Sequence, residues 1–71
     1  MSKKFLDWEP VIIIGNSLEL EPSPIGLEAL IIEADHDEEM YLIEYRTRGM
    51  IHTERLPAED LDYVYNYRGA L

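Results

Sequence analysis

The sequence predicts a small, mostly β domain, and three observations lead to this prediction. Short apolar segments rich in Ile, Val, Leu and Tyr alternate with glycine, proline and charged turn residues, which is typical of strands. The 71 residues are enough for one domain, and a hydrophobic content of 46% is enough for a folded core. The chain has no cysteine, so neither disulfides nor cysteine-bound zinc can stabilise that core. We therefore expect a single domain held together by hydrophobic packing.

The first half of the chain predicts one strand and a long loop. Val11–Ile14 is a short β-branched run that ends at Gly15-Asn16, a pair typical of turns. Pro22 and Pro24 follow within residues 18–28, and two prolines at this spacing fit neither a central strand nor a helix interior. A loop of this length in so small a domain is usually functional or packed on itself.

The middle of the chain predicts a hairpin. Ala29–Ala34 and Met40–Arg46 are the two strands, and the charged segment Asp35–Glu39 connects them. A helix over residues 28–44 is the alternative, because Ala, Leu and Glu favour helices. The Ile and Tyr residues and the Asp-His-Asp break favour the hairpin.

The last third predicts two more strands and one helical turn. After an Arg48-Gly49 turn, Met50–Leu56 alternates in polarity and is expected to form the fourth strand. Pro57–Leu61 opens with proline and carries two acids, which suits the start of a short helix. Asp62–Tyr67 is expected to form the final strand.

The two ends of the chain flank these elements. Residues 1–9 are expected to form an N-terminal arm with Phe5 and Trp8 as anchors, residues 10–67 the domain, and residues 68–71 a C-terminal tail. No apolar run reaches the roughly 18 residues that a membrane span needs, and no signal-peptide pattern follows the N-terminal lysines. We therefore expect a soluble, cytoplasmic protein.

The order of elements resembles that of the SH3-like barrel, and three local motifs add to the resemblance. Residues 25–35, IGLEALIIEAD, are similar to the glycine-led second strand of small prokaryotic SH3-like domains. Residues 40–45, MYLIEY, resemble their third strand, and residues 56–61, LPAEDL, with Val64 resemble their closing turn and last strand. The resemblance implies a small five-stranded barrel over about residues 10–65. It does not imply a function, because such domains serve many.

Charge is the most informative global feature. Fifteen acidic and six basic side chains give a net charge of −9, and residues 5–45 contain no lysine or arginine. A field of this sign repels nucleic acid and anionic lipid and attracts a basic protein surface. We therefore expect no direct nucleic-acid or membrane partner. Nucleic-acid binding, the alternative, would require the four arginines to gather on one face: Arg46, Arg48, Arg55 and Arg68.

Acidic side chains in two predicted loops are the first set of candidate protein-binding residues. They are Glu19, Glu21, Asp35, Asp37, Glu38 and Glu39. Carboxylates such as those of residues 35–39 can bind a hard cation, but this segment lacks the spacing and the glycine of a calcium loop. A solvated hairpin tip or an acidic contact patch is the simpler interpretation, and no metal is expected.

Aromatic side chains form the second set, namely Trp8, Tyr65 and Tyr67. Tyr63, Tyr65 and Tyr67 would share one face of the final strand, because side chains alternate along a strand. Tyrosine is enriched at protein interfaces but also caps cores. Both roles remain open for these rings.

Catalysis is not expected. No serine lies in a nucleophile-elbow motif, and the four glycines form no phosphate-binding loop. The histidines, His36 and His52, have no nucleophile to activate, so surface or core roles are the simpler interpretation. We expect neither an enzyme nor a cofactor.

Two functional hypotheses follow. In the first, the chain is a non-catalytic acidic module that masks a basic surface on a protein partner such as a nuclease or a nucleic-acid-binding protein. A phage- or plasmid-type inhibitor or immunity protein that mimics nucleic acid would work in this way. In the second, the chain is an accessory subunit or adaptor held in a larger complex by hydrophobic and aromatic contacts. Either a monomer or a homodimer fits the sequence.

Overall fold

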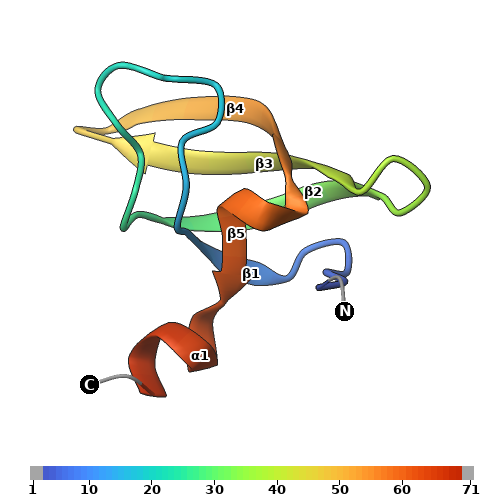
Figure 1. The fold of residues 1–71 in the computed structure, drawn as a ribbon. Coiled ribbons are helices and arrows are strands. Elements are labelled where there is room, and N and C mark those ends of the chain that lie inside the picture. The colour runs from blue at the N-terminus through green and yellow to red at the C-terminus, as the bar shows by residue number, and fades with distance from the viewer. Residues whose placement is uncertain (1–2, 70–71) are drawn as a thin grey trace.

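A five-stranded antiparallel sheet is the framework of the protein (Figure 1). A computed structural model of the chain describes residues 3–69. The order of the strands across the sheet is β4-β3-β2-β1-β5, so the last strand lies beside the first. The elements are β1 (Pro10–Ile13), β2 (Glu28–Asp35), β3 (Met40–Thr47), β4 (Met50–Pro57), the 3-10 turn η1 (Ala58–Asp60), β5 (Leu61–Tyr63) and α1 (Val64–Gly69).

The predicted fold class is confirmed. The domain is mostly β, it has five strands, and one helical turn precedes the last strand. The helix that residues 28–44 could have formed is absent, because β2 and β3 pair there as a hairpin with Ile31 opposite Ile43. The first four strands begin and end within about one residue of the predicted bounds.

The predicted final strand over Asp62–Tyr67 is wrong beyond Tyr63. Val64–Gly69 is helical, so the three tyrosines do not share one strand face. The register pairs Tyr63 with Val11, so Val64 would next face Pro10. Proline has no N–H to donate to a neighbouring strand. Residues 64–67 have strand propensity, but β1 begins at Pro10 and so offers them no further residues to pair with.

One core collects the inward side chains of all five strands. Along β3, the buried positions Tyr41, Ile43 and Tyr45 alternate with more exposed ones, as expected when one sheet face covers a core. A bulge after Ile31 in β2 shifts the register against β3. Bulges increase strand bending and twist, so β2 can pair with β3 on one side and with β1 on the other while the sheet wraps around the core.

The N-terminal segment closes one end of this core through Phe5. Its ring is completely buried and lies 5.2 Å from the Tyr41 ring, edge to face, and 4.8 Å from the Tyr63 ring. The backbone of Lys4 both donates to and accepts from the Tyr63 hydroxyl. Phe5 therefore acts as the predicted anchor, whereas the Trp8 side chain is exposed.

The loop between β1 and β2 is held at its base by the buried carboxylate of Asp60. Ser17 donates to this carboxylate twice, from its backbone N–H at 3.0 Å and from its hydroxyl at 2.7 Å. Gly15 passes so close that a Cβ atom there would lie 2.6 Å from Asp60 Oδ1. Further along, Gly26 N–H donates to the Ile13 carbonyl and Pro24 is buried. The long loop is thus packed onto the domain, as one of its two expected roles requires.

Candidate protein-binding surface

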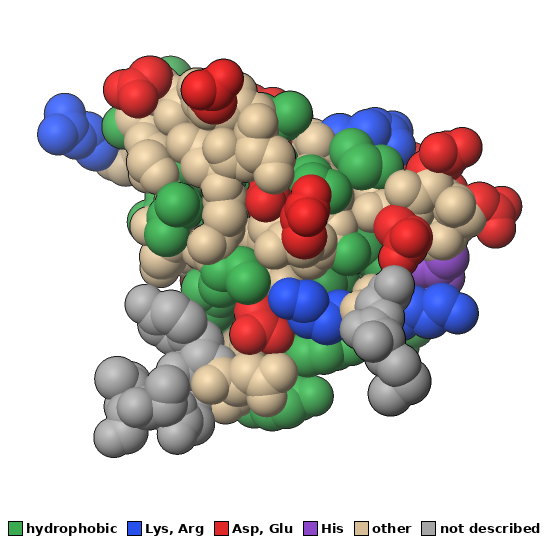
Figure 2. Space-filling view, in the orientation of Figure 1, with side chains coloured by type: hydrophobic (Ala, Val, Ile, Leu, Met, Phe, Trp, Pro, Cys, Tyr) green, Lys and Arg blue, Asp and Glu red, His purple; other side chains and the backbone are tan. Residues whose placement is uncertain are grey.

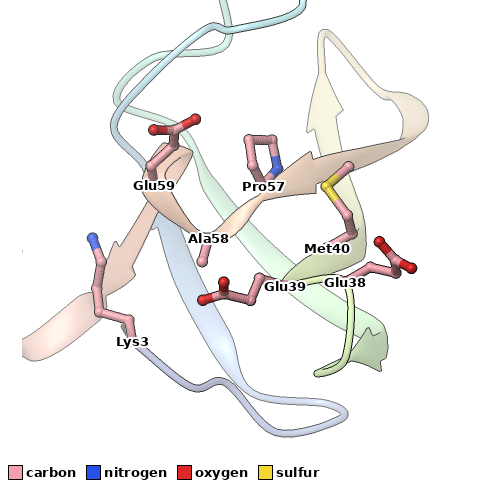
Figure 3. A pocket seen from close by; sticks show the side chains of 7 residues that line it. All are labelled: Lys3, Glu38, Glu39, Met40, Pro57, Ala58 and Glu59. Atoms are coloured by element: carbon pink, nitrogen blue, oxygen red, sulfur yellow. The ribbon is translucent and has the colours of Figure 1, made fainter. Parts of the chain in front are cut away.

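A groove of about 560 Å³ lies between the β2–β3 hairpin and η1 (Figure 3). Its apolar lining comes from Met40, Pro57 and Ala58. Its charged lining comes from three carboxylates and one lysine: Glu38, Glu39, Glu59 and Lys3. The groove therefore combines an apolar surface with a negative rim.

Strand pairing brings the two sides of this groove together. Met40 at the start of β3 lies opposite Pro57 at the end of β4 in the register. The Ala58 N–H donates to the Glu39 carbonyl at 3.1 Å, which ties η1 to the hairpin tip. At that tip, Asp35 Oδ1 accepts a hydrogen bond from the Glu38 N–H at 3.2 Å. These backbone contacts fix the positions from which the glutamates project.

The groove carries an excess of negative charge. Lys3 donates its Nζ to the Leu61 carbonyl at 2.6 Å, so its ammonium is engaged by the backbone. Within residues 3–66, whose side chains the structure describes, no hydrogen bond or ion pair engages the carboxylates of Glu38, Glu39 or Glu59. Charges this exposed can pair with an incoming cation without first losing a partner within the protein.

The predicted residues Asp35 and Asp37 lie beside the groove but not in it. They line a shallower hollow of about 380 Å³ together with His36 and Arg55. The His36 Nε2 is 2.9 Å from the Phe5 carbonyl, so this ring helps to hold the N-terminal segment. Within residues 3–69, no three His, Cys, Asp or Glu side chains are grouped so that they could hold a metal ion. The hairpin acids therefore form a surface patch.

The predicted residues Glu19 and Glu21 lie on the long loop, away from the groove lining. Glu21 lines a separate small cavity with Tyr45, His52 and Glu54. In the space-filling view, acidic side chains lie over the β1–β2 loop, over η1 and over the β2–β3 hairpin on the same face (Figure 2). The two predicted acidic loops thus share a face of the molecule without forming one continuous site.

Of the predicted aromatic residues, Trp8 and Tyr65 do not line the groove. The side chains of Trp8 and Tyr65 are 65% and 68% exposed. Tyr65 lies on α1, where its ring stacks on Tyr63 at 5.2 Å. The side chain of Tyr67 lies outside those that the structure describes. Trp8 and Tyr65 therefore remain available for contacts that do not involve the groove.

Sequence reasoning missed the residues that make the groove a groove. The sequence predicts Glu59 only as one of two acids in the helical turn, and it indicates no binding role for Met40 or Pro57. The signal lay in the hairpin register: once β3 pairs with β4, Met40 and Pro57 must face each other and bring η1 next to residues 38 and 39.

Together these features define a small antiparallel β domain with an acid-rimmed, apolar-lined groove. Comparisons of the chain with protein-family models, with curated proteins and with solved structures find no match. No helix within the described residues is both long and apolar enough to cross a membrane.

Proposed function

We propose that the chain is a non-catalytic binding module whose acidic face masks a basic surface on a partner protein. The observation that carries this proposal is the groove, because the carboxylates of Glu38, Glu39 and Glu59, which pair with no described side chain, rim an apolar lining. Lysine and arginine side chains have the same two parts, an apolar stem and a charged head. The groove therefore complements a lysine or arginine side chain in both polarity and charge.

The distribution of charge supports a partner that normally binds nucleic acid. The net charge is −9, and acidic side chains extend over two loops and η1 on one face. Such a face would compete with phosphates for a basic groove, and its field would accelerate association. An inhibitor or immunity protein of the phage or plasmid type would work in the cytoplasm by this means.

The assignment to the SH3-like barrels belongs to this proposal. The strand order β4-β3-β2-β1-β5, the packed loop after β1 and the 3-10 turn before β5 support it.

The experiment is capture of a partner from an extract of the native cell, followed by affinity measurements on the purified pair. The first comparison uses about 0.1 M and about 1 M salt, between which the Debye length falls from about 10 Å to about 3 Å. Charge masking predicts that binding weakens steeply across this range. A partner that binds equally well at both salt concentrations would contradict the proposal.

The second comparison uses matched charge variants. The double variant Glu38→Gln and Glu59→Gln should weaken binding by about tenfold, if each exposed pair contributes about 0.7 kcal/mol. The control, Glu33→Gln with Glu44→Gln, changes the net charge equally but leaves the groove lining intact. Equal losses from the two variants would mean that the overall charge acts and the groove does not.

An accessory subunit held by aromatic contacts is the second candidate function. It is favoured by the exposure of Trp8 and Tyr65, which are large rings on the surface of a small domain. In this case Tyr65→Ala or Trp8→Ala should abolish capture of the partner, and neither salt nor the glutamate variants should matter.

A further inference from the structure

A second cavity, of about 100 Å³, lies beneath the long loop at the opposite end of β3 from the groove. We call it the Tyr45 cavity; Glu21 contributes from the loop, Tyr45 from β3, and His52 and Glu54 from β4. This volume corresponds to about three waters at roughly 30 Å³ each. It suits the end of a side chain and is far below the roughly 300 Å³ at which drug-sized ligand sites begin.

Strand alternation explains why polar side chains reach this position. Leu56 is buried on the inner face of β4, so Glu54 and His52, two and four residues earlier, point to the same side. On β3, Tyr45 is the last of the inward residues that form the core. The inner face of the sheet therefore continues past the apolar core as polar residues, with the long loop packed over them.

Tyr45 lines this cavity, and its hydroxyl has no hydrogen-bond partner among the described side chains. The side chain is 7% exposed, and no hydrogen bond engages its hydroxyl within residues 3–66. No fully enclosed side-chain nitrogen or oxygen among the described residues lacks a partner, so the Tyr45 hydroxyl is open to solvent, and the Tyr45 cavity is one of two hollows that this residue lines. Tyr41, on the same face of the same strand, accepts a hydrogen bond from the Phe5 N–H.

The charged carboxylates that line the cavity belong to Glu21 and Glu54. Burial raises the pKa of the Tyr45 phenol, and the negative charge of Glu54 raises it further. The Glu54 carboxylate is therefore close enough to the phenol to affect its ionisation. His52 Nε2 is held 2.5 Å from Thr47 Oγ1, and its ring stacks on Tyr45 at 5.1 Å. The stack gives the cavity an aromatic wall, and the two carboxylates supply negative charge.

We propose that the Tyr45 cavity binds the cationic end of one arginine or lysine side chain, between the carboxylates of Glu21 and Glu54 and against the Tyr45 hydroxyl. A guanidinium carries only donors, so it needs acceptors arranged around it. Both carboxylates and the phenol oxygen can accept. The source of this side chain, a basic surface of the partner, rests on the proposed function. The binding of such a cation in the cavity is independent of the proposed function.

The test is a titration of the ¹⁵N-labelled chain with L-argininamide, followed by amide chemical shifts. Amide shifts should concentrate at residues 20, 21, 45 and 52–54, and the analogue citrullinamide, whose side chain is uncharged, should leave them unchanged. Glu54→Gln should weaken argininamide binding by about tenfold or more, as loss of a hydrogen bond to a charged group predicts. Glu21→Gln, on the exposed loop, should weaken binding without any risk to folding.

The control variant is Glu59→Gln, which removes the same charge from the groove and leaves the Tyr45 cavity intact. Binding weakened by Glu59→Gln and unaffected by Glu54→Gln would overturn the inference and leave the charge-masking function standing. Equal shifts with citrullinamide, or no shifts with either compound, would also overturn it. A salt-insensitive partner in the capture experiment would instead refute the proposed function, while the argininamide titration would still report on the cavity.

Discussion

The two tyrosines on the inner face of β3, Tyr41 and Tyr45, each pack against another ring but differ in what surrounds their hydroxyls. Tyr41 has its hydroxyl paired with the Phe5 N–H at 3.3 Å and its ring against the fully buried Phe5 ring. Tyr45, four residues along the strand, has a histidine as its stacking partner and a cavity beside it, and its hydroxyl has no hydrogen-bond partner among the described side chains. The Tyr41 end of the core is filled by the Phe5 ring and the Tyr41 hydroxyl is hydrogen-bonded, whereas a cavity lies at the Tyr45 end.

The difference separates an end of the core that stabilises the fold from an end that we propose binds a cationic side chain. Phe5 comes from outside the sheet and fills the Tyr41 end with apolar surface, which stabilises the fold. At the Tyr45 end a loop rich in proline and glutamate provides the cover, and its residues Leu20, Glu21 and Pro22 line the space that remains. Changes at the first end should therefore alter folding, and changes at the second should alter binding.

The largest expected effect is at the filled end. Phe5→Ala should lower the free energy of unfolding by about 3–5 kcal/mol, because it removes a completely buried ring and leaves a cavity against Tyr41 and Tyr63. Urea denaturation, followed by circular dichroism, measures this directly. The control is Leu6→Ala: its side chain is 66% exposed, so the change should stay within about 0.5 kcal/mol. Similar stability of the two variants would mean that the N-terminal segment does not close the core.

The next effect concerns the attachment of the loop that covers the open end. Asp60→Asn should lower the free energy of unfolding by about 1–3 kcal/mol, because the two Ser17 donors lose a charged, buried acceptor. Amide hydrogen exchange at Ser17 should accelerate more than exchange in β3. Glu59→Gln, at the neighbouring exposed position, is the control and should change neither quantity. Unchanged exchange at Ser17 in Asp60→Asn would show that the loop is held by other contacts.

Much of the filled end could be predicted from the sequence, and little of the open end. The strands were readable because each is a short run of alternating or β-branched residues, and Phe5 was expected as an anchor. The last strand was not, because the strand propensity of Val64–Tyr67 says nothing about Pro10, the residue that would have had to pair with it. Propensity is local, whereas a strand also needs a partner with donors to offer.

The candidate sites divide in the same way. The acids of the β2–β3 hairpin could be placed on a surface from charge alone, because five polar residues in a row between two strands must be solvated. The groove needed the pairing of Met40 with Pro57, and the Tyr45 cavity needed the loop to pack over the inner face of β4. Both depend on contacts between residues far apart in the sequence, which no local pattern specifies.

The smallest expected effect separates the two tyrosine hydroxyls. Tyr41→Phe should lower the free energy of unfolding by about 1 kcal/mol at neutral pH, because the Phe5 N–H loses its acceptor in a buried environment. Tyr45→Phe should change it by less than about 0.5 kcal/mol, because its hydroxyl has no partner within the described side chains to lose. Equal losses from the two substitutions would contradict the contrast between the two ends.

Alkaline pH sharpens the same contrast, because burial and the charge of Glu54 raise the pKa of Tyr45 in the folded state. Below about pH 10, the ordinary pKa of tyrosine, the phenol is protonated in both states and its contribution to stability is fully present. As the pH rises from there through the raised folded pKa, the unfolded chain loses the proton first, so the free energy of unfolding falls. Tyr45→Phe should remove this part of the alkaline decline. Urea denaturation of both proteins at pH values on either side of 10 measures the difference, and an identical decline in the two would mean that the Tyr45 end is as open to water in the fold as in the unfolded chain.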